Sequence, residues 1–290
     1  MLLVIPNISE GRDRAVVDAV GAAYVAAGAV LLNTHADPDH HRSVHTLAVP
    51  DAAAVPAILV AGAREAIARI DLRADRGLHP HIGALDVAPV VHLRAEDRGT
   101  ACATALTAAE ELGRLGLPVF LYGRLAGGRA RAEIRRGGTA ALAARLEAGE
   151  LRPDFGPPAL HPTAGAVLVA ARPPLVAFNV ELASGATLEQ ARAIAAAIRE
   201  GGPDGLPAVR AIGLALTRPD GLGVVQVSTN VEDHEAVPLA AVVEAVARHA
   251  PVAGCELVGL APEAAFHGFP GGIPVRHRRT VEQALEGLSS

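Results

Sequence analysis

Two histidines and an aspartate lie within eight residues of this chain, His79-Pro80-His81-Ile82-Gly83-Ala84-Leu85-Asp86, directly before an apolar run. An imidazole can lend and take protons near neutral pH, because the unperturbed pKa of histidine is about 6.5. Pro80 fixes its own φ angle and disfavours helical backbone at His79, which places that imidazole at a rigid corner. The segment therefore indicates a general acid or base, with an incidental surface histidine in a turn as the alternative.

A second polar cluster spans residues 35–45 and holds four histidines, two aspartates and one arginine. Most of it falls in the polar segment from Thr34 to Arg42, which we expect to be a loop between strands at 30–33 and 44–49. Loops at strand ends carry binding and catalytic side chains more often than regular elements do. The composition is typical of such a loop, and a solvated polar loop is the alternative.

Two further segments place polar side chains at the ends of predicted strands. In residues 6–12, Asn7 or Ser9 can cap the following helix, whose free N–H groups would then suit an anion. In residues 226–230, Gln226 and Asn230 occupy alternate strand positions and so share one face, where amides could bind a heterocycle. A plain capping turn and an edge strand with outward polar residues are the respective alternatives.

The hydrophobic pattern predicts the order β-α-β-β-α-β twice. Thr187 should cap a helix of the second copy, with Gln190 in its first turn. Two such copies predict an α+β fold made of two ferredoxin-like subdomains. A Pro- and Gly-rich stretch at 152–162 places the boundary between domains 1–160 and 161–290. The first copy comprises strands 2–5, 30–33, 44–49 and 87–93 with helices 12–27 and 51–69; the second comprises strands 175–182, 209–216, 224–228 and 256–260 with helices 187–199 and 239–249. Helices at 98–115 and 139–148 and a strand at 119–122 are expected between the copies.

Composition excludes several classes of function. The chain has 290 residues, a net charge of −5 and only 2% aromatic residues, which argues against a nucleic-acid partner. All 26 basic residues are arginines, so lysine Schiff-base chemistry is excluded and anions must be held by arginine or backbone N–H groups. Cys102 and Cys255 form no CxxC motif, and we expect no structural zinc site. The first residues lack a signal-peptide pattern, and no apolar run approaches the ~20 residues of a membrane helix, so we expect a cytoplasmic protein without a membrane partner.

Several segments together resemble the formiminotransferase domain family, whose activity is that of a glutamate formimidoyltransferase. They occur in order over nearly the whole chain. The segments are Val4-Ile5-Pro6-Asn7-Ile8-Ser9-Glu10-Gly11-Arg12, Asp37-Pro38-Asp39-His40-His41-Arg42-Ser43-Val44, the segment from His79 to Val87, Tyr122-Gly123, Pro153-Asp154-Phe155-Gly156-Pro157, Ala177-Phe178-Asn179, residues 226–230 and Leu257-Val258-Gly259-Leu260. The resemblance implies two ferredoxin-like subdomains, transfer of a formimino group from N-formimino-L-glutamate to the co-substrate tetrahydrofolate, no metal, and a homodimer.

The resemblance also implies roles for individual residues. His79 matches the catalytic histidine and would act as the base, while Asp37 or Asp39 would steady the amidinium charge or orient His79. Arg42 would hold a substrate carboxylate. The positions expected to bind substrate or folate are Asn7, Glu10, His41, Arg42, Asp86, Gln226 and Asn230.

Two departures from the family pattern keep other functions open. His41 stands where an asparagine is common, and Arg124 where a glutamate is frequent. One alternative is a metal-dependent hydrolase, because imidazole and carboxylate mixtures suit Zn²⁺ or Mn²⁺. Its ligands would come from His35, Asp37, Asp39, His40, His41 and His79. The others are a folate enzyme acting on 5-formyltetrahydrofolate and a folate-binding protein without catalysis.

Overall fold

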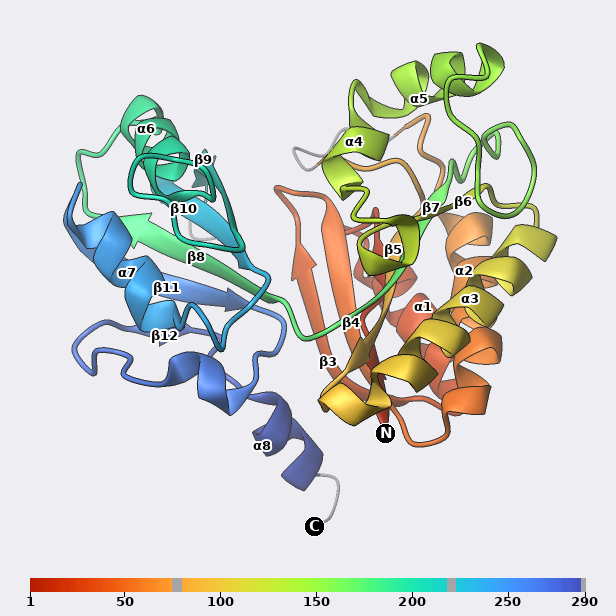
Figure 1. The fold of residues 1–290 in the computed structure, drawn as a ribbon, viewed down its shortest axis with the longest axis horizontal. Helices are drawn as coiled ribbons and strands as arrows, with labels where there is room; N and C mark the ends of the chain where they lie inside the picture. Colours follow the sequence, from red (N-terminus) through yellow and green to blue (C-terminus); the bar gives the residue numbers. More distant parts are fainter. Residues whose placement is uncertain (75–79, 218–222, 288–290) are drawn as a thin grey trace. The chain divides into compact units, whose positions relative to one another are not determined.

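The computed structural model describes residues 1–74, 80–217 and 223–287. His79 lies outside the described residues, and so do residues 218–221, where a turn is expected between the predicted strands 209–216 and 224–228. The chain forms two compact units, Met1–Arg172 (unit 1) and Pro173–Ser290 (unit 2), each with its own hydrophobic core (Figure 1). Each unit combines helices with a sheet that has both parallel and antiparallel pairs, which confirms the predicted α+β class.

Unit 1 is built on a seven-stranded sheet. Its strands are β1 (Leu2–Val4), β2 (Asn7–Ile8), β3 (Val30–Asp37), β4 (Arg42–Val49), β5 (Leu85–His92), β6 (Val119–Leu121) and β7 (Val167–Arg172), and its helices are α1 (Arg14–Ala26), α2 (Val55–Arg69), α3 (Arg98–Arg114), α4 (Arg131–Arg135) and α5 (Gly138–Glu147). β3 pairs with β4, and the two short strands β1 and β2 both lie between β4 and β5. Beyond β5 come β7 and then β6, both in parallel pairing.

The second polar cluster forms a hairpin end, and the prediction of a loop over residues 34–42 was wrong. β3 continues to Asp37 and β4 starts at Arg42, and these two residues are register partners. Backbone pairing between the strands holds the polar residues extended, because a sheet ladder forms whether or not the side chains are apolar. The chain turns only between them, at residues 38–41.

Three elements of unit 1 were missed by the sequence analysis, the short strand β2, the helix α4 and the strand β7. β7 is buried between β5 and β6, and a continuous apolar run is typical of such a parallel strand. Because β7 pairs with β5 and β6, unit 1 extends to Arg172. The composition-based boundary at 160/161 stays a prediction.

Helices cover the sheet of unit 1 unevenly. α1 starts after Asp13, whose side chain accepts a hydrogen bond from Ala15 N (2.9 Å), and it buries Val17, Val20 and Tyr24 in the main core with α2 and α3. Ile134 of α4 and Leu142 of α5 belong to a separate core over β5, β6 and β7. Those three strands are therefore apolar in nearly every position.

The approach of residues 80–86 to β7 requires a glycine. A Cβ atom on Gly83 would lie 1.8 Å from the carbonyl oxygen of Ala166, so no side chain fits there. Ser9 adds to this contact, because its hydroxyl donates a hydrogen bond to the carbonyl of Gly83 (2.8 Å).

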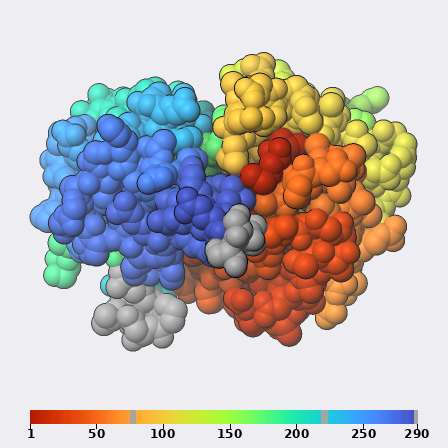
Figure 2. Space-filling model, turned by 90° about the horizontal axis from the view of Figure 1, so that it is seen from below, coloured from red at the N-terminus to blue at the C-terminus, as the bar shows by residue number. Residues whose placement is uncertain are grey.

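The start of the chain is at the other end of the sheet, and Figure 2 shows the first residues (dark red) at the surface there, where Met1 is 49% exposed.

Unit 2 contains a five-stranded sheet in the order β12-β11-β8-β10-β9. Its elements are β8 (Val176–Leu182), α6 (Leu188–Ile198), β9 (Val209–Thr217), β10 (Gly223–Val231), α7 (Leu239–Ala247), β11 (Val252–Val258), β12 (Val275–Arg276) and α8 (Val281–Glu286). The predicted cap of α6 is confirmed: Thr187 accepts from Gln190 N (3.2 Å) and the Gln190 side chain accepts from Thr187 N (2.8 Å). Among the described residues, none of the helices combines the length and apolar character needed to cross a bilayer.

Candidate functional site

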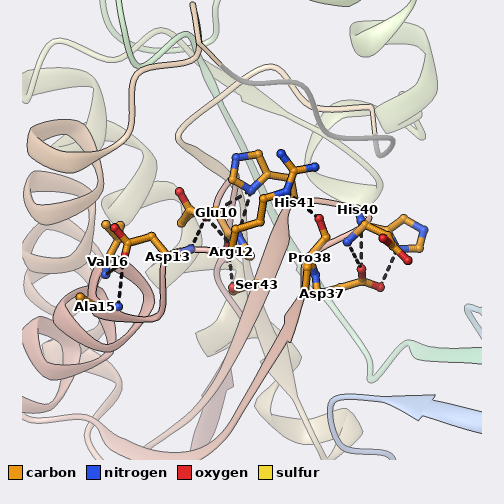
Figure 3. Close-up of polar contacts among 12 residues, drawn as sticks. Glu10, Arg12, Asp13, Ala15, Val16, Asp37, Pro38, His40, His41 and Ser43 are labelled. Carbon is orange, nitrogen blue, oxygen red and sulfur yellow. Dashed lines mark hydrogen bonds and ion pairs between the residues drawn. The ribbon is translucent and has the colours of Figure 1, made fainter. Parts of the chain in front are cut away.

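The hairpin end at residues 37–42, the segment from Asn7 to Asp13 and Asp86 meet at one end of the unit 1 sheet. β2 lies between β4 and β5, so Asn7 is a register partner of both Val44 and Val87. This pairing brings together three of the segments that the sequence analysis singled out. Figure 3 shows the polar contacts around the hairpin end.

Asp37 closes the hairpin turn. Its Oδ1 accepts hydrogen bonds from the backbone N–H groups of Asp39 and His40 (both 2.9 Å), and its Oδ2 lies 2.6 Å from His40 Nδ1. Burial raises the pKa of Asp37, but the hydrogen bonds from His40 outweigh it and hold the pKa below its usual value. The Asp39 carboxylate, in contrast, has no hydrogen bond or ion pair within the described part of the chain. Of the two aspartates, Asp39 has the side chain that can accept a ligand without breaking the turn.

Glu10 and His41 join the start of α1 to the hairpin. Glu10 Oε1 accepts from the N–H groups of Arg12 (2.7 Å) and Asp13 (2.9 Å). His41 Nδ1 lies 3.2 Å from both Gly11 N and Glu10 Oε1. A neutral ring can accept from the Gly11 N–H, and a protonated ring can donate to Glu10, so one nitrogen makes only one of these bonds at a time.

The backbone at this junction is unusually tight. His41 has a φ angle of +50°, in the left-handed region where asparagine is tolerated better than most residues. A Cβ atom on Gly11 would lie 2.2 Å from the Asp37 carbonyl oxygen. In Figure 3 the rings of His40 and His41 point to different partners, His40 to Asp37 and His41 to Glu10. Their nitrogens therefore do not converge on one point.

Asp86 is fully buried and holds two arginines. Its Oδ2 accepts from Arg42 (2.6 Å) and from Arg135 of α4, while its Oδ1 accepts from Ile82 N (2.9 Å). Arg42 also donates from Nε to Asn7 Oδ1 (3.1 Å). Burial raises the pKa of Asp86, but the charges of Arg135 and Arg42 lower it by more, so the pKa lies below its usual value. The carboxylate is therefore ionised at neutral pH. Burial lowers the pKa of Arg42 to about 10, which still leaves it a cation.

This cluster contains three of the predicted binding residues, Asn7, Arg42 and Asp86, and two arginines that the sequence analysis did not single out. Asn7 and Asp86 both position Arg42, and Asp86 also ties down the backbone three residues after His79. Arg135 and Arg131 come from α4, which the sequence analysis did not predict. The available signal was the density of arginines between residues 124 and 136.

Gln226 and Asn230 lie on β10 of unit 2. Val227 and Val231 of the same strand belong to the core with α6 and α7, so Gln226 and Asn230 occupy the opposite face, as their alternation predicts. Gln226 is 1% exposed, and its Nε2 has no hydrogen-bond partner among the described residues. Polar and charged neighbours on β8, β11 and β12 share an ion network: Arg276 pairs with Glu181 and Glu256, and Asn179 donates to Glu256 (3.1 Å).

Within residues 1–74, 80–217 and 223–287, no group of three or more His, Cys, Asp or Glu side chains is arranged to hold a metal ion. Asp37, His40 and His41 of the hairpin end instead make hydrogen bonds with one another or with backbone groups. His79, the other proposed ligand, lies outside these residues.

Comparison with known proteins gives a consistent result across both units. Residues 1–172 match the family described as formiminotransferase domain, N-terminal subdomain, and residues 177–268 match the family described as formiminotransferase domain. The chain is 41% identical over 276 residues to a formimidoyltransferase-cyclodeaminase of Sus scrofa, covering 89% of this chain and 49% of that protein. It thus spans about half the length of the curated relatives of this kind that it matches.

Shorter relatives match over most of their length. A glutamate formimidoyltransferase of Streptococcus pyogenes serotype M1 is 35% identical over 272 residues, which cover 90% of this chain and 89% of that protein. A glutamate formimidoyltransferase of Thermoplasma acidophilum is 34% identical over 278 residues, with coverages of 90% and 88%.

Proposed function

Because the chain belongs to the formiminotransferase domain family, we propose that it is a glutamate formimidoyltransferase. It would transfer the formimino group of N-formimino-L-glutamate to N5 of tetrahydrofolate, which is a co-substrate rather than a resident cofactor. The observation that carries this proposal is the match of both units, in order, to the two subdomains of one family, together with near full-length similarity to two glutamate formimidoyltransferases. No step of the reaction requires a metal.

His79 is the proposed general base. As N5 of tetrahydrofolate attacks the amidine carbon, N5 becomes cationic, and a neutral imidazole that removes its proton prevents the adduct from collapsing back. The resulting imidazolium then returns the proton to the departing glutamate nitrogen as the C–N bond breaks. Positioned proton transfer of this kind typically contributes about 10²–10⁴ in rate. The hydrogen bond from Ile82 N to the buried Asp86 supports the proposal, since it anchors the backbone close after His79.

Asp39 is the better placed of the two aspartates to stabilise the amidinium charge. Both carboxylate oxygens of Asp37 are used in the hairpin turn, whereas the Asp39 carboxylate has no partner in the described part of the chain. Glu10 and His41 would shape the wall of the site, and Asn7 and Asp86 would hold Arg42 beside the substrate. Gln226 and Asn230 would present amides to the heterocycle of folate, and the buried Nε2 of Gln226 is a donor suited to that role.

We also propose the finer features of the fold and assembly that accompany this activity. Each unit would be a ferredoxin-like subdomain. The order β-α-β-β-α-β from β8 to β11 supports this, as does the same order from β1 to β5 when β1 and β2, which pair with the same two strands, count as one interrupted strand. The homodimer and the cytoplasmic location rest on the family resemblance and on composition. Sedimentation of the purified chain measures the oligomeric state directly.

Transfer from N-formimino-L-glutamate to tetrahydrofolate, followed by acid conversion to the absorbing methenyl product, tests the activity. We expect His79→Ala to fold, to bind tetrahydrofolate, and to lose turnover by about 10²–10⁴. His81→Gln, which changes the other imidazole of the same segment, is the control and should retain turnover. Normal turnover in His79→Ala would refute the assignment of the base.

The same assay separates this function from the alternatives. Folate binding by calorimetry without turnover would direct the search to another one-carbon donor, such as 5-formyltetrahydrofolate, or to a binding protein. Loss of activity after chelation, with recovery on adding Zn²⁺ or Mn²⁺, would favour the metal-dependent reaction instead.

A further inference from the structure

Arg131 in α4 is a half-buried cation without a counter-charge among the residues that the structure describes. Its guanidinium lies 5.5 Å from the centre of the Tyr122 ring. Within the described part of the chain, its side chain takes part in no hydrogen bond or ion pair. A guanidinium that stacks on a ring by its face leaves the N–H groups at its edge available to an acceptor.

The surroundings of Arg131 are positively charged. Arg42 and Arg135 share the single carboxylate of Asp86, and Arg131 is close enough to Arg42 for their charges to repel. Two guanidinium groups therefore share one carboxylate, and the third, that of Arg131, adds positive charge close to Arg42. Arg135 also has a buried Nε that lacks a hydrogen-bond partner within residues 1–74, 80–217 and 223–287.

Neighbouring acidic residues do not neutralise this excess charge. Glu133 lies two residues from both arginines of α4, on a different side of the helix, and is exposed. On the strand side, Asp154 is already paired with Arg129 and accepts from Leu121 N (2.7 Å). Placing like charges together away from water is costly unless an anion balances them. A negatively charged group beside Arg131 would balance this excess charge.

α4 is held so that this arginine is in a defined position. Arg145 of α5 donates to the carbonyl oxygens of Glu133 (3.2 Å) and Ile134 (3.1 Å). These hydrogen bonds give partners to two carbonyl groups at the C-terminal end of the short helix α4. The Ile134 side chain is fully buried in the core over β5, β6 and β7. Packing on one side and hydrogen bonds at the end fix α4 against the sheet.

We propose that Arg131, assisted by Arg135, binds a carboxylate group of a substrate. The paired N–H groups of a guanidinium match the two oxygens of a carboxylate, and the ion pair would balance the excess charge. The assignment deepens the function proposed above and rests on it. Under that function two substrates carry the same chemistry, the glutamate part of N-formimino-L-glutamate and the glutamyl tail of tetrahydrofolate.

Steady-state kinetics of Arg131→Gln test the proposal and identify the carboxylate. A charged hydrogen bond of this kind corresponds to about a 10- to 100-fold rise in KM, with kcat little changed. The rise should appear for N-formimino-L-glutamate if the donor is bound, and for tetrahydrofolate if its tail is bound. Arg131→Lys, which keeps the charge but not the fork, should recover part of the loss.

Arg136→Gln is the matched control, because Arg136 is an exposed arginine next to the same helix and its loss changes net charge equally. Unchanged KM values in Arg131→Gln, or equal rises in both variants, would overturn the proposal. Circular dichroism and thermal unfolding check that each variant folds.

Calorimetry keeps this proposal distinguishable from the proposed function. L-glutamate, tetrahydrofolate and tetrahydropteroate, which lacks the glutamate, are titrated into the wild type and into Arg131→Gln. An inactive wild type that binds one of the two carboxylate ligands in an Arg131-dependent manner would refute the function and retain the site. An active wild type whose binding and KM values are indifferent to Arg131→Gln would refute the site and retain the function.

Discussion

Replacing the buried carboxylate of Asp86 by an amide should destabilise unit 1 strongly. Asp86→Asn keeps the shape of the side chain, and its Oδ1 can still accept from Ile82 N. What is lost is the negative charge that holds Arg42 and Arg135 together. The variant therefore isolates the charge interaction from packing and from the backbone hydrogen bond.

The size of the effect follows from burial. Asp86 has no exposed side-chain surface, and the two arginine side chains are each only 11% exposed. Removing one partner of a buried ion pair typically costs about 3–5 kcal/mol, since the remaining charge stays buried without compensation. Here two cations lose the same partner, so the upper part of this range is expected. For a domain of this size the loss corresponds to a fall in Tm of roughly 10 °C.

Thermal unfolding followed by circular dichroism measures the change, with Asp71→Asn as the control. Asp71 forms an ion pair of the same kind with Arg73, but both side chains are largely exposed, and no measurable change in Tm is expected. The double variant Asp86→Asn with Arg135→Gln should recover part of the lost stability, because one of the two uncompensated charges is gone.

A dependence on pH provides a second check. The pKa of Asp86 is lower in the folded protein than in the unfolded chain, so its stabilisation is fully present above about pH 4 and is lost as the pH falls further. The difference between wild type and Asp86→Asn should therefore narrow below about pH 4. A Tm of Asp86→Asn within the error of the wild type at neutral pH would refute the reasoning.

His45 is fully buried, its Nε2 lies 3.1 Å from Val17 O, and burial lowers its pKa, so the unfolded chain binds this proton more tightly than the folded protein does. As the pH drops below about 6.5, the free energy of unfolding should decrease by at most ~1.4 kcal/mol per pH unit. The decrease should be less steep in His45→Gln. Guanidinium chloride unfolding at a series of pH values measures both slopes, and equal slopes would contradict the assignment. His41→Asn should preserve stability, because asparagine tolerates the left-handed backbone and its Oδ1 can accept from Gly11 N. His41→Val, β-branched at the same φ, should lose about 1–2 kcal/mol in the same assay, and equal stability of the two variants would show that the backbone is not the constraint.

Local signals were sufficient for much of the fold and for most of the chemistry-bearing segments. The capping box at Thr187 involves residues three apart, and the periodicity of α1 requires only its own sequence, so both were predictable. The motif around His79 and the composition of the hairpin end likewise indicated where polar side chains concentrate. Their predicted roles in catalysis and folate binding stay predictions.

Long-range pairing decided what local signals could not. β3 extends to Asp37 and β4 begins at Arg42, because each strand supplies backbone hydrogen-bonding partners to the other. The polar side chains at these strand ends are, by composition, typical of a loop. β7 enters the first unit because it fills the position between β5 and β6.

Asp86 and Arg135 meet across 49 positions of sequence, a contact that no periodicity encodes. By itself, the sequence determined which residue types are available, arginine alone for binding anions and histidine and aspartate for proton transfer and charge. The tertiary structure decided which of them are already paired and which, such as Asp39 and Arg131, keep side chains without an ion-pair partner in the described part of the chain. Pairing depends on distances in space, and these are settled only when the sheet and α4 have packed.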